Sequence, residues 1–207
     1  MIKEGNLAIN SIVNIVDDDT LIHKWLAAVL KSNGLQFQCY DCAAKFMKDF
    51  DPSTPGCILL DLKMPEINGL ELQKHLQTEG NKSPIIFLTG TADVSSAVKA
   101  LKNGAFDFLE KPLEKNTLLN VVTKALDQDL RQRYEGLEKT QVKRQLSQLT
   151  KREEEVLNWL VKGKPNKTIA QMLNISIRTV EVHRKNIMEK TEAGSLANLV
   201  KMALDTN

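Results

Sequence analysis

The chain has 207 residues, of which 42% are hydrophobic and 26% are charged, with a formal net charge of +2. This composition is ordinary for a globular protein, and the length allows two small domains or one of generous size. No apolar stretch is long enough to span a bilayer and no signal-peptide pattern follows Met1, so we expect a cytoplasmic protein without a membrane partner.

Short apolar runs alternate with longer amphipathic stretches in the first part of the chain. The runs, expected as strands, are Ile12–Val16, Gln36–Tyr40 and residues 57–60, 85–88 and 105–109. The stretches between and after them, expected as helices, are residues 21–32, 43–50, 69–76, 94–103 and 118–126. Three runs are almost continuously apolar, as strands buried on both faces of a parallel sheet are. The pattern predicts a doubly wound α/β domain over residues 1–127, with a five-stranded parallel sheet.

The next segment is dominated by charged residues and Gln, with thinly spaced leucines. We expect a helical linker over residues 128–147 that extends the fifth helix. It is either a pairing seam between two chains or a solvated linker, which Gly136 favours. Both interpretations fit the composition equally well.

The last part of the chain has a helical pattern throughout. Thr150 and Glu153 form a capping-box signature at the start of a first helix. A second, short helix ends in a tight turn at Asn174, and Ser176 can cap a third. A fourth helix over residues 196–204 completes an all-α, four-helix domain over residues 148–207.

Acidic side chains follow two of the apolar runs where each run ends. Asp17, Asp18 and Asp19 come directly after the first run, and Asp61 follows the third. The carboxyl ends of strands 1 and 3 can be neighbours in a parallel sheet, and ligands bind at that edge. Carboxylates that converge repel one another unless a cation neutralises them. Mg²⁺ suits such oxygen ligands and keeps waters and phosphate oxygens in its shell.

Two further strand ends carry a hydroxyl and an ammonium group, Thr89 and Lys111, the latter followed by Pro112. Each residue alone has an ordinary explanation as a helix cap, a turn former or a loop residue. Together, an aspartate, a divalent cation, a hydroxyl and an ammonium fit phosphoryl transfer to a carboxylate, with the aspartate as nucleophile.

Residues 12–126 resemble the receiver domain of two-component response regulators. The resemblance rests on Val16-Asp17-Asp18-Asp19, Leu59-Leu60-Asp61-Leu62-Lys63-Met64-Pro65 with Asn68-Gly69, Leu88-Thr89-Gly90, and Gly104-Ala105-Phe106-Asp107-Phe108-Leu109-Glu110-Lys111-Pro112. It implies a flavodoxin-like fold in which Asp61 is the phospho-acceptor. Mg²⁺ would be held by Asp18, Asp61 and the backbone carbonyl of Lys63, with Asp17 acting through a metal-bound water.

The same resemblance implies a switch. Thr89 would turn to bond the phosphoryl group, Phe108 would swing inward into the space this frees, and Lys111 would pair with a phosphoryl oxygen.

The cysteines and two of the histidines are expected to be structural. Cys39 and Cys42 have the two-residue spacing of a metal or redox motif, but no second cysteine pair or nearby histidine accompanies them. We expect Cys39, Cys42 and Cys57 to be buried as small hydrophobic residues. His23 and His75 each stand alone on a helix and are expected to be surface or packing residues.

The C-terminal part of the chain is basic and contains a helix with two unlike faces. Residues 128–207 have 15 Lys and Arg against 10 Asp and Glu, whereas residues 1–127 have 13 against 16, so a polyanion is the expected partner of the second part. On the third helix Val180 and Ile187 can pack inward. The solvent face holds Arg178, Glu181, Val182, Arg184 and Lys185. Such a helix fits the DNA major groove, with Lys167 and Thr179 placed for phosphate contacts; by charge alone, a solvated face explains it as well.

Residues 149–204 resemble the effector domain of LuxR/FixJ (NarL-type) transcription regulators. The match rests on Leu149-Thr150-Lys151-Arg152-Glu153, Asn166-Lys167-Thr168-Ile169-Ala170, Ile175-Ser176-Ile177-Arg178-Thr179-Val180-Glu181-Val182-His183-Arg184 and Ser195-Leu196. It implies a helix-turn-helix domain that dimerises through its last helix, binds inverted-repeat half-sites and faces bases with Glu181, Val182 and Lys185. Ile177 stands where many members have Pro, and Thr191 where an apolar residue is usual, which bears on dimer packing.

Together the two resemblances predict a response-regulator transcription factor. A sensor histidine kinase would supply the phosphoryl group, and phosphorylation would favour a homodimer through the face around residues 94–103 and 105–109. The helix-turn-helix would then bind double-stranded promoter DNA. Such a protein is not an enzyme, because it catalyses only its own phosphorylation and dephosphorylation.

Two alternatives come from other classes of protein. One is a Mg²⁺-dependent phosphotransferase or phosphatase acting on a small molecule, in which a second Asp two residues after the nucleophile often serves as general acid. That position is Lys63 here, which argues against it. The other is a protein-interaction module that does not bind DNA.

Overall fold

The computed structural model describes residues 11–90 and 99–205. The chain divides into two compact units, Met1–Arg133 and Tyr134–Asn207. Among the described residues, no helix combines the length and the apolar character that crossing a membrane requires.

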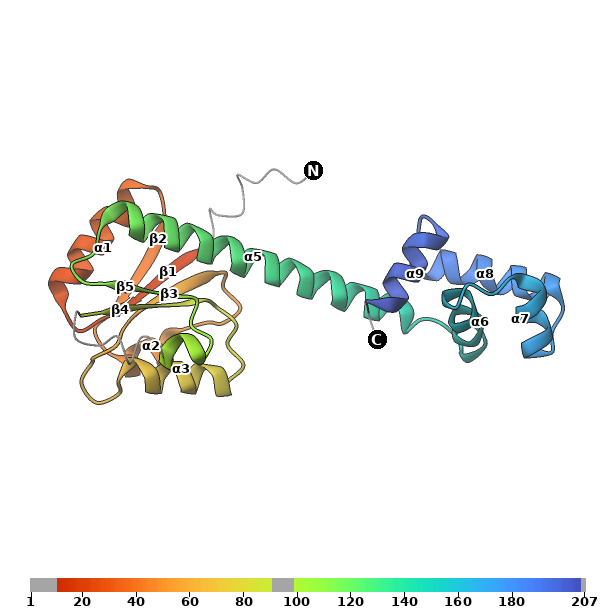
Figure 1. The fold of residues 1–207 in the computed structure, drawn as a ribbon, viewed down its shortest axis with the longest axis horizontal. Helices are drawn as coiled ribbons and strands as arrows, with labels where there is room; N and C mark the ends of the chain where they lie inside the picture. The colour runs from red at the N-terminus through yellow and green to blue at the C-terminus, as the bar shows by residue number, and fades with distance from the viewer. Residues whose placement is uncertain (1–10, 91–98, 206–207) are drawn as a thin grey trace. The chain divides into compact units, whose positions relative to one another are not determined.

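The first unit is built on a five-stranded parallel sheet (Figure 1). Its strands are β1 (Ile12–Val16), β2 (Gln36–Tyr40), β3 (Gly56–Asp61), β4 (Ile85–Thr89) and β5 (Asp107–Glu110), in the order β2-β1-β3-β4-β5. β3 and β4 are buried over their whole length and β1 over all but its first residue. The three apolar runs are therefore central strands, which confirms the predicted α/β class.

Helices cover both faces of this sheet. On one face, α1 (Thr20–Ser32) and the first part of α5 (Lys115–Leu146) pack against it, and on the other lie α2 (Ala43–Asp49) and α3 (Gly69–Thr78) (Figure 1). Residues 99–102 are helical, and the rest of the helix predicted over residues 94–103 lies outside the described residues.

The fifth helix is much longer than the pattern of residues 118–126 indicates. Its first turn is stabilised by Glu114, whose carboxylate accepts hydrogen bonds from the backbone N–H groups of Asn116 and Thr117. From Lys115 the helix runs without a break to Leu146, and Gly136 does not interrupt it. The apolar pattern ends earlier than the helix because only residues up to Asp129 have a buried face.

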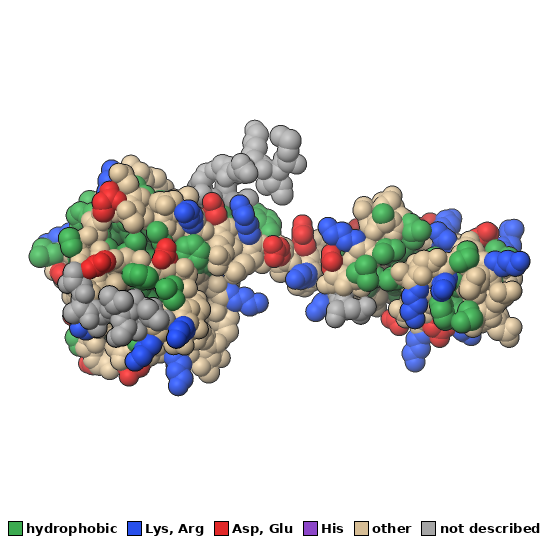
Figure 2. Space-filling model, viewed as in Figure 1, with side chains coloured by type: hydrophobic (Ala, Val, Ile, Leu, Met, Phe, Trp, Pro, Cys, Tyr) green, Lys and Arg blue, Asp and Glu red, His purple; other side chains and the backbone are tan. Residues whose placement is uncertain are grey.

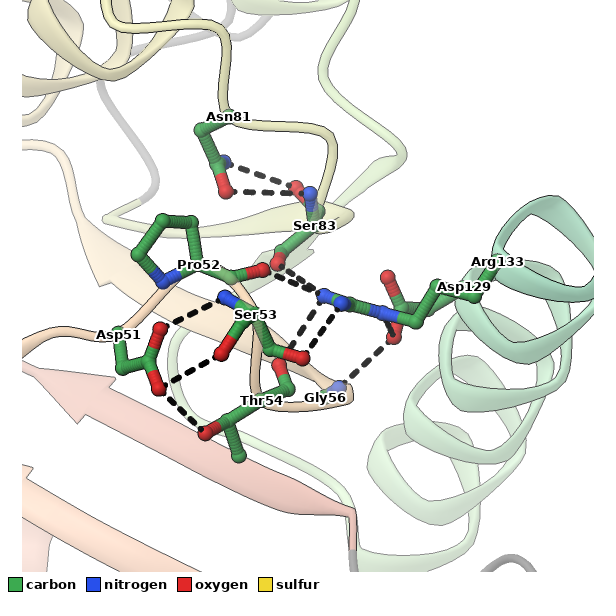
Figure 3. Close-up of polar contacts among 9 residues, drawn as sticks. All are labelled: Asp51, Pro52, Ser53, Thr54, Gly56, Asn81, Ser83, Asp129 and Arg133. Atoms are coloured by element: carbon green, nitrogen blue, oxygen red, sulfur yellow. Dashed lines mark hydrogen bonds and ion pairs between the residues drawn. The ribbon is translucent and has the colours of Figure 1, made fainter. Parts of the chain in front are cut away.

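A polar cluster fastens α5 to the amino ends of the strands (Figure 3). Buried Asp129 accepts a hydrogen bond from the backbone N–H of Gly56 at 2.9 Å and pairs with Arg133 at 2.7 Å. The Arg133 guanidinium also donates to the carbonyl oxygens of three consecutive residues, Pro52, Ser53 and Thr54. We call this group of six residues the base clasp.

The second unit contains four short helices in addition to the end of α5 (Figure 1). They are α6 (Lys151–Val161), α7 (Asn166–Leu173), α8 (Ile177–Thr191) and α9 (Leu196–Leu204). The capping box of Thr150 and Glu153 and the Ser176 cap of α8 are present, as predicted. Asn174 adopts the left-handed conformation, with φ 53°, in the turn between α7 and α8.

The core of the second unit is apolar and joins all four helices. Its fully buried members include Val156, Ile169, Val180, Ile187 and Leu199. Val180 and Ile187 thus anchor α8, which leaves the opposite side of that helix facing solvent.

Candidate functional site

The carboxyl ends of β1 and β3 lie side by side in the sheet. Val16 pairs with Leu60, so the residues that follow, Asp17 and Asp61, are neighbours. Asp17 is fully buried and Asp61 is 7% exposed. Two buried carboxylates therefore converge at the edge where the sequence predicts them.

The ammonium group of Lys111 lies between these two carboxylates. Its Nζ donates to Asp17 Oδ2 at 2.8 Å and to Asp61 Oδ1 at 2.6 Å. The backbone N–H of Lys111 donates to the carbonyl oxygen of Thr89 at 2.7 Å, which fixes the residue just beyond the end of β5. The peptide bond between Lys111 and Pro112 is cis.

The backbone around Asp61 completes the site. Asp61 Oδ2 accepts the backbone N–H of Lys63 at 2.6 Å. Gly69, at the start of α3, packs so closely on β3 that a Cβ there would collide with the carbonyl oxygen of Asp61. Asn68 thus starts α3 and forms a capping box with Glu71. Gly69 lets the helix approach β3 more closely than any residue with a Cβ would allow.

Burial and charge act on Asp61 in opposite directions. Burial raises the pKa of Asp61 above its usual range, and the charge of Asp17 adds to this, while hydrogen bonds from Lys111 and Lys63 partly offset it. For Lys111, burial lowers the pKa, but the hydrogen bonds to Asp17 and Asp61 outweigh it and the pKa is raised. The ammonium is therefore firmly charged beside a carboxylate with a raised pKa.

The remaining residues predicted for this site lie around the pair. The Thr89 hydroxyl is buried and donates to the carbonyl oxygen of Gly90 at 3.0 Å, and Phe108 is 38% exposed. Asp18 is exposed, whereas Asp17 Oδ1 accepts the backbone N–H of Asp19, which in turn caps α1. The structure thus brings Asp17, Asp61 and Lys111 into contact and leaves Asp18 and Phe108 toward solvent.

The oxygen donors at this edge suit a magnesium ion. Asp17 and Asp61 already place one oxygen each around a single cation, the Lys111 ammonium. Mg²⁺ takes one or two carboxylates and completes its shell with water and phosphate oxygens. Within residues 11–90 and 99–205 no group of three His, Cys, Asp or Glu side chains is placed to hold a metal.

The prediction for the cysteines is wrong in part. Cys57 is fully buried, Cys42 is half-buried and Cys39 is exposed. Cys39 lies on β2, and because β2 is at the edge of the sheet, its side chains are covered less than those of the central strands.

The predicted DNA-contact residues lie on α7 and α8. Five of them, Lys167, Arg178, Glu181, Val182 and Lys185, are exposed, while Thr179 and Arg184 are half-buried. Figure 2 shows Lys and Arg side chains in blue at several separate places on the visible face of the second unit. The exposed side of α8 therefore carries charge and an apolar side chain, Val182, as major-groove contacts require.

The two half-buried residues have partners within the domain. Thr179 contacts the capping hydroxyl of Ser176, and Arg184 Nη1 donates to Asn166 Oδ1 at 2.6 Å. The contact of Arg184 with Asn166 is absent from the sequence-based prediction, because the two residues are 18 apart and no spacing rule connects them.

Comparisons with known proteins match both units. Residues 13–123 match the family described as "Response regulator receiver domain", and residues 147–203 match "Bacterial regulatory proteins, luxR family". The transcriptional regulatory protein FixJ of Azorhizobium caulinodans is 43% identical over 192 residues, which cover 93% of this chain and 91% of that protein. The response regulator protein TodT of Pseudomonas putida is 39% identical over 192 residues, covering 93% and 85%.

Solved structures agree with these matches. The response regulator StyR is 38% identical, with a TM-score of 0.86 over 94% of this chain and 98% of that chain. Full-length FixJ from B. japonicum is 34% identical, with a TM-score of 0.61 over 95% and 97%.

Proposed function

The chain belongs to the LuxR/FixJ-type response regulators and is a phosphorylation-dependent transcription regulator, and from this premise we propose that Asp61 is its phospho-acceptor. A kinase partner and DNA binding follow from the family. The residues that carry out each step are proposed from the geometry of the two units.

The observation that supports the proposal is the single ammonium shared by two buried carboxylates. Asp61 has one oxygen on Lys111 and the other on the backbone N–H of Lys63, so its side chain is fixed in one orientation. On phosphorylation, an Asp61 oxygen would form a bond to phosphorus while the bond from phosphorus to the donor atom breaks; that atom is a histidine nitrogen in a phosphorylated sensor kinase and an oxygen in acetyl phosphate. Lys111 would then pair with a phosphoryl oxygen and offset its negative charge.

Magnesium is the cofactor that fits this site. Receiver domains of this family generally bind Mg²⁺ at the acidic pocket. Here Asp61, the backbone carbonyl of Lys63 and Asp18 would hold the ion, with Asp17 acting through a bound water. When bound, the ion neutralises charge on the transferring phosphoryl oxygens.

Thr89 and Phe108 are proposed as the switch. In the arrangement described, the Thr89 hydroxyl donates to the carbonyl of Gly90, next to it in sequence, and Phe108 is partly exposed. A phosphoryl group on Asp61 would offer the hydroxyl charged acceptor oxygens. Thr89 would turn toward them, and the side chain of Phe108, on the adjacent strand, would fill the space that it leaves.

The DNA contacts are proposed for α7 and α8. Glu181, Val182 and Lys185 would face bases. The DNA backbone would be contacted by Lys167, Arg178, Thr179 and Arg184. A sensor histidine kinase would supply the phosphoryl group, and phosphorylation would favour a dimer. The protein would act in the cytoplasm, where promoter DNA is accessible. The receiver would catalyse only its own phosphorylation and dephosphorylation. The predicted dimer face includes residues 94–98, which lie outside the described residues.

The acceptor is tested by intact mass after treatment with acetyl phosphate and Mg²⁺. We expect one added phosphoryl group on the wild type and none on Asp61→Asn or when Mg²⁺ is chelated. Asp41→Asn is the matched control, because Asp41 is an exposed carboxylate paired with Lys45 and should leave labelling unchanged. Equal labelling of wild type and Asp61→Asn would place the acceptor elsewhere.

A further inference from the structure

Arg184 is held at the start of α7 by a single hydrogen bond. Its Nη1 donates to Asn166 Oδ1 at 2.6 Å, and both side chains are half-buried. In the described part of the chain this is the only hydrogen bond of the guanidinium, and no carboxylate pairs with it. Arg184 therefore keeps its full positive charge and most of its N–H donors for an outside acceptor.

The surroundings of Asn166 favour an anion. Asn166 is the first residue of α7, and its N-cap, Pro165, has no side-chain acceptor for the N–H groups of the first turn. Lys164 and Lys167, on either side in the sequence, are exposed. Two exposed lysines thus flank Asn166 in the sequence, and the Arg184 guanidinium lies at the positive end of a helix dipole, which favours a DNA phosphate.

The hydrogen bond to Asn166 also restricts the conformations of the Arg184 side chain. A free arginine side chain loses much rotamer freedom when it binds, which weakens the interaction. An amide oxygen accepts one N–H without neutralising the charge, whereas a carboxylate partner would cancel it. Asn166 is therefore suited to orient the guanidinium and leave its charge available.

We infer that Asn166 is a positioning residue for DNA-backbone binding, holding Arg184 so that its free N–H groups meet one phosphate of the duplex. The inference rests on the proposed DNA-binding function of α8. It differs from a purely structural role, in which the bond would only fasten α7 to α8 and would not change the number of phosphates contacted.

The test is the salt dependence of DNA affinity. The full chain, treated with acetyl phosphate, is titrated into a fluorescein-labelled duplex of arbitrary sequence, and anisotropy is followed between about 50 and 200 mM NaCl. Each lost phosphate contact lowers the slope of log K against log salt by about 0.9 in magnitude. We expect Arg184→Gln to lower it by that amount, Asn166→Ala to lower it too, and the double variant to go no further than Arg184→Gln.

A matched control separates this effect from charge and folding. Arg152→Gln removes the same charge from an exposed pair with Glu155 on α6 and should keep the wild-type slope. Thermal unfolding of Asn166→Ala, followed by circular dichroism, reports whether the variant is folded at the titration temperature.

Three outcomes would overturn the inference. If folded Asn166→Ala keeps the wild-type slope while Arg184→Gln lowers it, Arg184 reaches its phosphate without Asn166. If neither variant changes a steep wild-type slope, the duplex is bound by other residues. If the wild type itself has no salt-dependent affinity for the duplex, the proposed DNA binding fails and the inference with it.

Discussion

Glu153 is a buried carboxylate that the fold keeps ionised. Its side chain is 3% exposed, and one oxygen accepts from the Thr150 backbone N–H, the Thr150 hydroxyl and the Lys190 ammonium at 2.8, 3.0 and 2.7 Å. Burial raises its pKa, but the hydrogen bonds from Lys190 and Thr150 outweigh this and lower the pKa to about 2. The capping residue of α6 is thereby tied to the end of α8.

This pKa predicts how the stability of the second unit depends on pH. Because the pKa of Glu153 falls from 4.5 to about 2 on folding, its stabilising contribution is complete above pH 4.5 and is lost as the pH falls through about 2. Glu153→Gln should lower the free energy of unfolding by about 1–2 kcal/mol at pH 7, with the difference shrinking between pH 4.5 and 2. Urea unfolding followed by Trp159 fluorescence in a Trp25→Phe background measures this, and a pH-independent difference would contradict it.

The positions of some site and core side chains can be predicted from the sequence, and those of others cannot. Asp61 and Thr89 stand directly after apolar runs and Lys111 two residues after one, so the parallel topology alone places them at one edge. The capping box of Thr150 and Glu153 has a fixed spacing of three. The contacts Glu153–Lys190 and Arg184–Asn166 join residues 37 and 18 apart, and they depend on how helices pack, which no local pattern encodes.

At the scale of elements, α5 shows where periodicity stops being informative. Hydrophobic spacing reports the face of a helix that is buried, and α5 has such a face only as far as Asp129. The remainder, which the composition predicts as a helical extension, is helical to Leu146 and mostly exposed. The base clasp cannot be seen in the sequence, because three of its acceptors are backbone carbonyls in the segment from Pro52 to Thr54.

Removing the clasp should destabilise the first unit. Arg133→Ala leaves the carboxylate of Asp129, which is 1% exposed, with the Gly56 N–H as its remaining partner and leaves three carbonyls without their donor. We expect a loss of roughly 2–3 kcal/mol in the free energy of unfolding, since a buried charge loses its pair. Chemical denaturation followed by Trp25 fluorescence in a Trp159→Phe background checks it. Arg131→Ala, an exposed arginine two residues earlier, is the control and should change stability little.

For the whole molecule, phosphorylation is expected to change both the mass in solution and the affinity for DNA. Phosphorylation would add charge at Asp61, the proposed acceptor at one edge of the sheet, while the proposed DNA contacts lie in the other unit, so an effect on DNA would have to pass through a change in assembly or arrangement. We expect acetyl phosphate to double the solution mass from 23.2 kDa and to raise the affinity for duplex DNA, and Asp61→Asn to do neither. Light scattering after size exclusion measures the first effect. A phosphorylated chain that stays monomeric would rule out the dimerisation step.

The base clasp also limits where the receiver of this chain can be separated from its output domain. The segment that matches the receiver family ends at residue 123, but Asp129 and Arg133 lie beyond it and close the bottom of the same fold. A receiver joined to another output domain at residue 123 would therefore lack Asp129 and Arg133. For this chain, exchange of the output domain should therefore preserve function when the junction follows Arg133, within the exposed part of α5, so that the working boundary between the two units lies inside a helix.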